Sequence, residues 1–297
     1  MRPFYIGAIA LLVTGCTNYG LVQQDIIQAN DHQHDIAELK QFYGCRENDY
    51  LHYQPGKNYS KSAVVYAKKA YPFAMMSSNV NNNGEGRFVI PNWEFVEGAD
   101  NQFTGFEAEV YKRKSDGVIA IAFKGTGGIS DVIFGDTLGF HYAQADWYTS
   151  YIDRENPNAT SFILTGHSLG AGNALYVGKF EPTDKDNINE IYTFSHPTWW
   201  MRYVWPPELL AWFYNPKKLL NGQTHDRKVF ALTEDNDVLD VFRKDTQEVD
   251  FNKKGKLDEH AIYPLAIGLT YVAAANDDKA AEEALKGIGC IEADQKA

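Results

Sequence analysis

The spacing of hydrophobic and polar residues predicts a series of strands in the middle of the chain. Residues 105–112 and 118–124 both have strand-like patterns, and the second run is the more apolar, as in a buried strand. Ser115, Asp116 and Gly117 form a turn sequence between them, so the two strands are expected to pair as a hairpin. Further strands are predicted at residues 161–165, 190–195 and 228–233.

Helices are predicted around these strands. Residues 60–71 place apolar side chains at helical spacing, and the polar run that follows, SSNVNNNGEG, has the composition of a loop. A helix is predicted over 169–179. Residues 262–275 are apolar, with Pro264 in a tolerant first turn, and the run is too short for a membrane span, so it is expected to be a buried packing helix. The tail DDKAAEEALKGIG predicts an exposed helix that stops at Gly287.

The alternation of strands and helices favours an α/β fold with a mostly parallel sheet and crossover helices. The chain has 297 residues, of which 44% are hydrophobic, and this suits one large domain. Its 28 basic and 39 acidic residues give a formal net charge of -11. A nucleic-acid partner is not expected, because binding to a phosphate backbone requires clustered Lys and Arg.

The N-terminus resembles a bacterial lipoprotein signal. Residues 1–15, MRPFYIGAIALLVTG, carry one positive charge ahead of a short apolar run, which is typical of a secretory signal. The run ends in VTGC, similar to a lipobox, so Cys16 is expected to carry a palmitate-type acyl anchor in the cell envelope, and Thr17 after it favours the outer membrane. An ordinary secreted protein is the alternative. Residues 16–57 are expected to be a polar linker or first helix, and 58–297 the folded domain.

The sequence gives little support for a metal site and leaves the state of two cysteines open. His32 and His34 have the spacing of a ligand pair, but no third ligand is near, and no H-E-x-x-H motif occurs. We therefore expect no metal and no cofactor. Cys45 and Cys290 remain beside Cys16; in an oxidising compartment they either pair or stay as two free thiols, and both alternatives are open.

A serine motif lies at the junction of the strand 161–165 and the helix 169–179. Gly166 to Gly170 reads G-x-S-x-G, with Ser168 at its centre. A strand before the serine and a helix after it are the context of a nucleophile elbow, where the sharp turn leaves no room for side chains at the flanks. The helix N-terminus also places N–H groups and partial positive charge where an oxyanion forms.

A serine nucleophile needs a general base and an acid that orients the base. His196 follows the next strand directly, so no strand end lies between Ser168 and His196 to supply the acid. His225 precedes the strand 228–233 and is expected to be an exposed loop residue. His260 is the histidine that follows the acidic stretch ALTEDNDVLDVF. Spacing alone does not choose among the acids of that stretch, which are Glu234, Asp235, Asp237 and Asp240.

These segments resemble the class 3 lipases of the α/β-hydrolase fold. LTGHSLGA from Leu164 is similar to LTGHSLGG, FKGT at 123–126 to FRGT, and YTFSHP from Tyr192 to YTFGSP, while NDV at 236–238 fits an NDxV setting. The matches keep their order over roughly residues 60–275. The resemblance implies that 58–297 is an α/β-hydrolase domain, with a mostly parallel central sheet and helices on both faces.

The resemblance also implies roles for single residues. Ser168 becomes the nucleophile, His260 the general base and Asp237 the orienting acid. The oxyanion hole is formed by the N–H groups of Thr126 and Leu169. The position of Asp131 is one where family members have an Asp or Asn that supports the oxyanion loop; helix capping is the alternative reading.

Two departures from the family pattern stand out. Lys124 replaces the usual arginine, and His196 stands where a small residue is usual. The aromatic run TWWMRYVWPPELLAWFY after Pro197 is either a buried subdomain edge or a lid or wall that meets acyl chains.

The sequence therefore predicts a serine carboxylester hydrolase of the lipase or phospholipase type. Its substrate is expected to be an acyl lipid, cleaved through an acyl-enzyme, and its N-terminal lipid anchor is expected to hold it at a membrane. Two alternatives remain. One is an esterase or thioesterase that acts on soluble substrates, and the other is a catalytically inactive envelope lipoprotein that works as a binding module.

Overall fold

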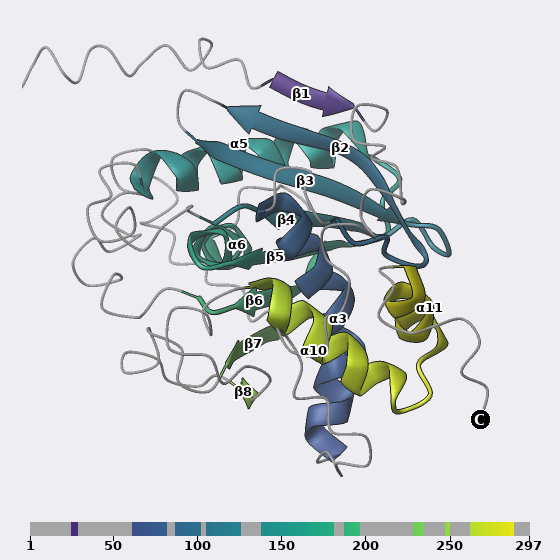
Figure 1. Cartoon of the computed structure of the whole chain (residues 1–297). Helices are drawn as coiled ribbons and strands as arrows, with labels where there is room; N and C mark the ends of the chain where they lie inside the picture. The colour runs from purple at the N-terminus through teal and green to yellow at the C-terminus, as the bar shows by residue number, and fades with distance from the viewer. Residues whose placement is uncertain are drawn as a thin grey trace, which may run out of the picture.

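A computed structural model describes residues 25–28, 61–81, 87–101, 105–125, 138–180, 187–196, 228–234, 247–249 and 262–287. Within these residues an 8-stranded sheet has its strands side by side in chain order (Figure 1). The strands are β1 (Asp25–Gln28), β2 (Trp93–Asn101), β3 (Phe106–Arg113), β4 (Ile119–Phe123), β5 (Phe162–His167), β6 (Ile188–Phe194), β7 (Lys228–Glu234) and β8 (Gln247–Val249).

The sheet changes character at β4. Strands β1 to β4 pair antiparallel, and β4 to β8 pair parallel. Parallel neighbours need a crossover connection, and α5 (Leu138–Glu155) lies between β4 and β5 in the chain, as α6 (Leu169–Phe180) does between β5 and β6. The predicted α/β fold, with its mostly parallel sheet, is confirmed.

Helices cover both faces of this sheet. The helices α3 (Lys61–Asn81), α10 (Ile262–Ala274) and α11 (Lys279–Gly287) pack on one face, which we call the α3 face, and α5 and α6 pack on the other, the α6 face. Figure 1 shows α3 and α10 crossing the near side of the sheet and α5 behind β2 and β3. The side chains of β4 alternate accordingly, with Ala120 and Ala122 in the core of the α3 face and Ile121 and Phe123 in that of the α6 face.

The structure corrects two of the predicted helices. Helix α3 continues to Asn81, so the run Ser77–Asn81, predicted as loop, forms its last turns. Ser77, Asn79 and Asn81 in this run are buried or partly buried and hydrogen-bonded to other parts of the chain, and such tertiary contacts outweigh their weak helix propensity. The predicted tail helix is α11, but it is amphipathic rather than exposed, because Ala281, Ala284 and Leu285 are buried.

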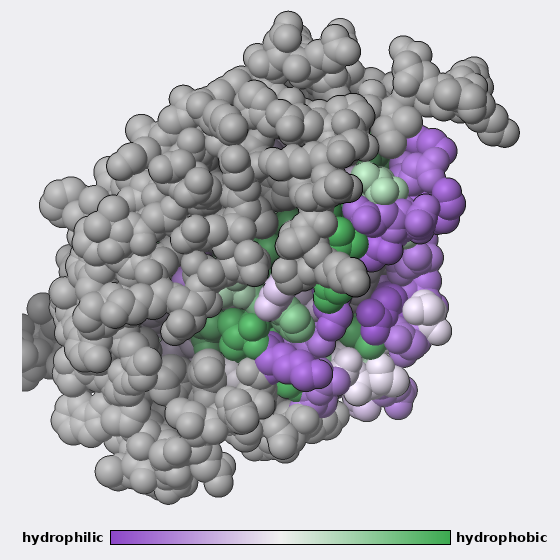
Figure 2. Space-filling model, turned by 90° about the horizontal axis from the view of Figure 1, so that it is seen from below, coloured by the Kyte–Doolittle hydropathy of each residue, from purple (hydrophilic) through white to green (hydrophobic). Residues whose placement is uncertain are grey.

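Few large apolar side chains of the described residues are exposed. Seen from below, the coloured surface is mainly hydrophilic, with smaller hydrophobic areas toward the middle of the view (Figure 2). Val65, Val89 and Trp147 are the large apolar residues that stay exposed, Trp147 by 43%. Among the described helices, none combines the length and the apolar composition that crossing a membrane requires.

Candidate active site

Ser168 occupies the sharp turn between β5 and α6. Its φ is +52°, in the left-handed region that a residue with a side chain rarely adopts. The Ser168 N–H donates to the carbonyl oxygen of Phe194 at 3.0 Å, and the Ser168 carbonyl oxygen accepts from Gly172 at 3.2 Å. Ser168 is therefore held by β6 on one side and by the first turn of α6 on the other, with only 3% of its surface exposed.

The glycines of the motif are required by close backbone contacts. A Cβ atom on Gly166 would lie 2.3 Å from the carbonyl group of Gly170, and one on Gly170 would lie 2.0 Å from the carbonyl oxygen of Phe123. Any side chain at either position would push α6 away from β4 and β5. This confirms the prediction that the sharp turn leaves no room for side chains on both flanks of the serine.

The N-terminus of α6 creates a positive electrostatic potential next to Ser168. Leu169 is the first residue of the helix, so its N–H is among the first-turn donors that have no acceptor within the helix. The helix dipole adds partial positive charge there. An oxygen that gains negative charge next to Ser168 would be stabilised by this helix end.

The chain that leaves β4 runs beside the serine. A Cβ atom on Gly125 would lie 2.7 Å from the carbonyl oxygen of His167 and 3.4 Å from the Cβ of Ser168. The preceding residue, Lys124, is tied to β3, because its N–H donates to the Glu107 carbonyl oxygen at 3.0 Å and its ammonium group binds the Glu107 carboxylate. Lys124 thus tethers the end of β4 to β3.

The environment of Glu107 reflects this tether. Burial raises the pKa of the Glu107 carboxyl group, and the hydrogen bond from Lys124 opposes that rise. The pair therefore lies in a poorly solvated position beside the end of β4, where a charge interaction is less screened than on the surface.

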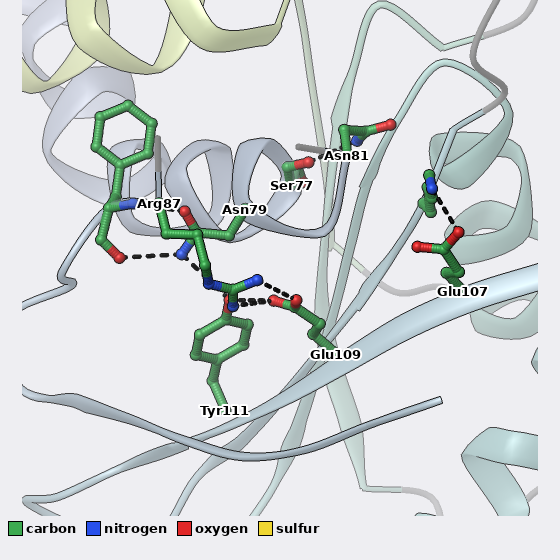
Figure 3. A network of polar contacts seen from close by, with 9 residues as sticks. Ser77, Asn79, Asn81, Arg87, Glu107, Glu109 and Tyr111 are labelled. Atoms are coloured by element: carbon green, nitrogen blue, oxygen red, sulfur yellow. Dashed lines mark hydrogen bonds and ion pairs between the residues drawn. The ribbon is translucent and has the colours of Figure 1, made fainter. Parts of the chain in front are cut away.

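A buried polar network supports the end of α3 (Figure 3). Arg87 donates to both oxygens of Glu109, at 2.6 and 2.8 Å, and Tyr111 donates to the same carboxylate. Figure 3 shows Arg87 and Tyr111 directed at Glu109 from different sides. Asn79 joins the network to α3, since its Nδ2 donates to Tyr111 at 3.2 Å, and it exchanges two hydrogen bonds with the backbone of Phe88.

The network also shifts ionisation. Burial alone would lower the pKa of Arg87, but Tyr111 and Glu109 outweigh it and raise that pKa. Burial and the nearby Glu109 charge raise the pKa of Tyr111 well above its usual value. At neutral pH the Arg87 guanidinium is therefore charged and the Tyr111 phenol is neutral.

The structure describes part of the predicted site. Ser168 and Leu169 are adjacent at the elbow, and Gly125, the residue before Thr126 in sequence, packs against Ser168. The other predicted site residues lie outside the described residues: Thr126, Asp131, Asp237 and His260, together with Cys16, Cys45 and Cys290. His196, which the sequence analysis set aside as a base, directly follows β6 and Ser195.

Sequence reasoning missed Ser77 and Asn81, whose side chains reach β5 and the end of β4. The signal in the sequence is a polar run directly after an apolar helical pattern, and the composition of that run predicts a loop. Among the described residues no group of three His, Cys, Asp or Glu side chains is arranged to hold a metal ion.

A left-handed serine between a parallel strand and a helix, on a sheet covered by helices on both faces, is the arrangement of the α/β-hydrolase fold. No protein-family model matches this sequence, and no curated protein sequence does so either.

Several solved lipases resemble the structure at low identity. Lipase from Rhizomucor miehei, in its propeptide complex, shares 13% identity with a TM-score of 0.42, over 69% of this chain and 78% of that one. Lipase from Rhizopus microsporus var. chinensis shares 13% with a TM-score of 0.44, over 72% and 90%. The Lip2 lipase of Yarrowia lipolytica shares 15% with a TM-score of 0.40, over 61% and 73%. With TM-scores at this level, the fold assignment rests on the strand order and the elbow geometry.

Proposed function

We propose that this chain is a serine carboxylester hydrolase that acts on acyl lipids, as a lipase or phospholipase. The observation that carries the proposal is the strained, buried Ser168, held at φ +52° directly before the N-terminus of α6. A left-handed serine costs about 1–2 kcal/mol, and such strain concentrates at functional sites. An inactive binding module would gain nothing from keeping it.

In the proposed reaction the Ser168 hydroxyl attacks the acyl carbon of the ester. His260 accepts the hydroxyl proton, and Asp237 orients the imidazole and stabilises its charged form. The carbonyl oxygen becomes an oxyanion bound by the N–H groups of Leu169 and Thr126. The C–O bond of the ester then breaks, and His260 returns the proton to the departing alcohol.

Water completes the cycle. His260 takes a proton from a water molecule, the hydroxide attacks the acyl-enzyme, and the fatty acid leaves as Ser168 regains its proton. Every proton is carried by the imidazole, so the proposed reaction needs no cofactor.

The proposal also places the chain at a membrane through its N-terminus. Acylation of Cys16 would hold the domain at the bacterial cell envelope, where acyl lipids are concentrated. Labelling cells with a palmitate analogue should mark the wild-type protein and leave Cys16→Ser unmarked. Unmarked wild-type protein would favour the secreted form instead.

A fluorophosphonate probe tests the catalytic proposal. It should label purified wild-type protein and fail to label Ser168→Ala, while His260→Ala and Asp237→Asn should label more slowly. Asp235→Asn and Asp240→Asn are the matched controls for the acid, and they should label at the wild-type rate. Well-folded wild-type protein that is not labelled would support the binding module.

A substrate panel separates the enzymatic alternatives. Emulsified glycerides and phospholipid vesicles should be cleaved faster than short p-nitrophenyl esters at equal acyl concentration. Cleavage of soluble esters alone would replace the lipid substrate by a soluble one and leave the triad proposal intact.

A further inference from the structure

Asn81, the last residue of α3, links that helix to the chain beside Ser168. Its Nδ2 donates to the Ser77 carbonyl oxygen at 2.5 Å, one helical turn back, and its Oδ1 accepts from the N–H of Gly125 at 3.0 Å. Only the amide nitrogen donates and only the amide oxygen accepts, so the two bonds define one orientation of the side chain. Asn81 therefore holds the peptide N–H of Gly125 at a fixed place relative to α3.

The end of α3 is itself fixed to the strand that carries the serine. The hydroxyl groups of Ser77 and Thr165 are 3.0 Å apart, and Thr165 donates to the Phe73 carbonyl oxygen at 3.3 Å. Thr165 lies on β5, which leads directly into Ser168. Helix α3 thus binds two chain segments. Ser77 connects it to β5, and Asn81 connects it to the end of β4.

We infer that Asn81 is a positioning residue for the oxyanion hole. The inference rests on the proposed function, in which the N–H of Thr126 binds the oxyanion. The peptide units that carry the N–H groups of Gly125 and Thr126 share the Cα atom of Gly125, so fixing the first unit fixes the point from which the second extends. Because the oxyanion exists only in the transition state and intermediate, Asn81 should act on kcat and hardly on KM.

The first test is the kinetics of Asn81→Ala on a soluble p-nitrophenyl ester. The substitution removes the acceptor of the Gly125 N–H without touching Ser168. We expect kcat to fall by about 10- to 100-fold, and KM to stay within about threefold of wild type.

Asn156→Ala is the matched control. Asn156 directly follows α5, and its Nδ2 donates to the Ile152 carbonyl oxygen at 2.9 Å, the same bond to the residue four positions back. It precedes β5, so it lies at the opposite edge of the sheet from Ser168. Its loss should leave kcat within about twofold of wild type.

Asn81→Asp provides a pH readout that a purely structural role would not give. A protonated carboxyl group can donate to the Ser77 carbonyl oxygen and accept from Gly125, as the amide does. The ionised group still accepts from Gly125, but it places a negative charge near the developing oxyanion. The ratio of variant to wild-type kcat should therefore rise as pH falls through the titration of the new carboxyl group. A ratio that does not change with pH would contradict the inference.

Hydrogen exchange tests the structural link without reference to activity. In Asn81→Ala the Gly125 N–H should exchange faster, while the N–H groups of β4 stay protected by their strand partners. If Asn81→Ala does not fold, the pH dependence of Asn81→Asp decides.

The outcomes separate the two proposals. An active wild-type enzyme, together with unchanged exchange at Gly125 or a kcat for Asn81→Ala within about twofold of wild type, would overturn the inference alone. Wild-type protein without Ser168-dependent hydrolysis would overturn the proposed function and this inference with it.

Discussion

The two faces of the central sheet hold their helices in different ways. On the α3 face, polar side chains bond across the interface, as Ser77 does with Thr165 and Asn81 with Gly125. On the α6 face, the helix approaches the strands through small residues. Gly170 lies against the backbone of Phe123, and a Cβ atom on Gly178 would come within 2.2 Å of the Ile191 side chain.

This difference shows how two constraints meet at Ser168. Close packing of α6 sets the distance between the helix N-terminus and the sheet, because glycine leaves no side chain to separate them. Hydrogen bonds from α3 set the orientation of single peptide groups, because a donor and an acceptor must align. Changes on the α3 face should therefore act through polar groups left unpaired, and changes on the α6 face through volume.

The largest expected effect is on the α3 face. Glu109→Ala leaves the buried Arg87 guanidinium without its carboxylate and should lower the free energy of unfolding by about 3–5 kcal/mol. Asp116→Ala is the control, because Arg113 and Asp116 form a similar two-bond pair with 33% and 48% of their side chains exposed, against 10% and 9% for Arg87 and Glu109. Urea unfolding of both variants measures the contrast, and the Asp116 change should be hard to resolve.

A double variant sharpens the same test. Arg87→Met with Glu109→Leu removes both charges and should recover most of the stability lost by Glu109→Ala. If the double variant is as unstable as the single one, then shape rather than charge pairing governs this part of the α3 face.

On the α6 face, Gly170→Ala should lower the free energy of unfolding by about 3 kcal/mol. The added methyl group meets a carbonyl oxygen of β4, so α6 must move. Gly287→Ala is the control, because a Cβ atom there meets nothing within 4 Å. Thermal unfolding followed by circular dichroism compares them; equal stability of the two variants would mean that α6 adapts easily.

The backbone strain at Ser168 should make a glycine variant more stable than an alanine variant, which is the reverse of the order in a regular helix. Both Ser168→Gly and Ser168→Ala lack the hydroxyl group, but glycine adopts φ +52° freely, so the glycine variant should be more stable by about 1 kcal/mol. In the middle of α5 the order should reverse, with Ser150→Ala more stable than Ser150→Gly by about 1 kcal/mol. Denaturant midpoints of the four variants measure this, and the same order at both sites would contradict a strained serine.

The smallest expected effect on stability comes from the ionisation of the partly buried Glu97 carboxyl group. Burial, and to a lesser extent repulsion from Glu155, raises the pKa of Glu97 above its ordinary value of 4.5. The folded state then binds this proton more tightly than the unfolded state, so ionised Glu97 lowers stability as pH rises above 4.5.

Glu97→Gln should therefore be more stable than wild type at pH 7, by roughly 0.5 kcal/mol after allowance for solvent screening. The difference should shrink as pH falls below 4.5, because Glu97 then becomes protonated in both states. Glu94→Gln, an exposed position on the same strand, is the control and should show a smaller gain. A gain for Glu97→Gln that persists at pH 4 would point to packing instead of charge.

Periodicity and turn residues predicted much of this fold. The hairpin of β3 and β4, the strands β5 to β7, and the helices α6 and α10 all lie close to their predicted positions. Strand β2 was missed because Glu94, Glu97 and Asp100 interrupt its apolar pattern, and a bulge between Phe95 and Glu97 shifts its register. The second half of α3 was missed because its polar residues are stabilised by partners far away in sequence.

The candidate site shows the same division. Ser168 was predictable because a motif carries its geometry in five consecutive residues. Asn81 was not, because its role depends on a hydrogen bond to Gly125, 44 positions along the chain. The local sequence shows that the turn at Ser168 needs glycines. Only the folded chain shows that Asn81 holds the residue after β4.

The direction of β3 has a practical consequence for labelling this molecule. Because β3 and β4 are antiparallel, the tight turn that joins them lies at the opposite edge of the sheet from Ser168. Ser115 in this turn is exposed, while Arg113 and Asp116 close the turn around it. A fluorophore or short peptide tag attached at Ser115 would report on the protein's location while leaving the serine end of the sheet untouched.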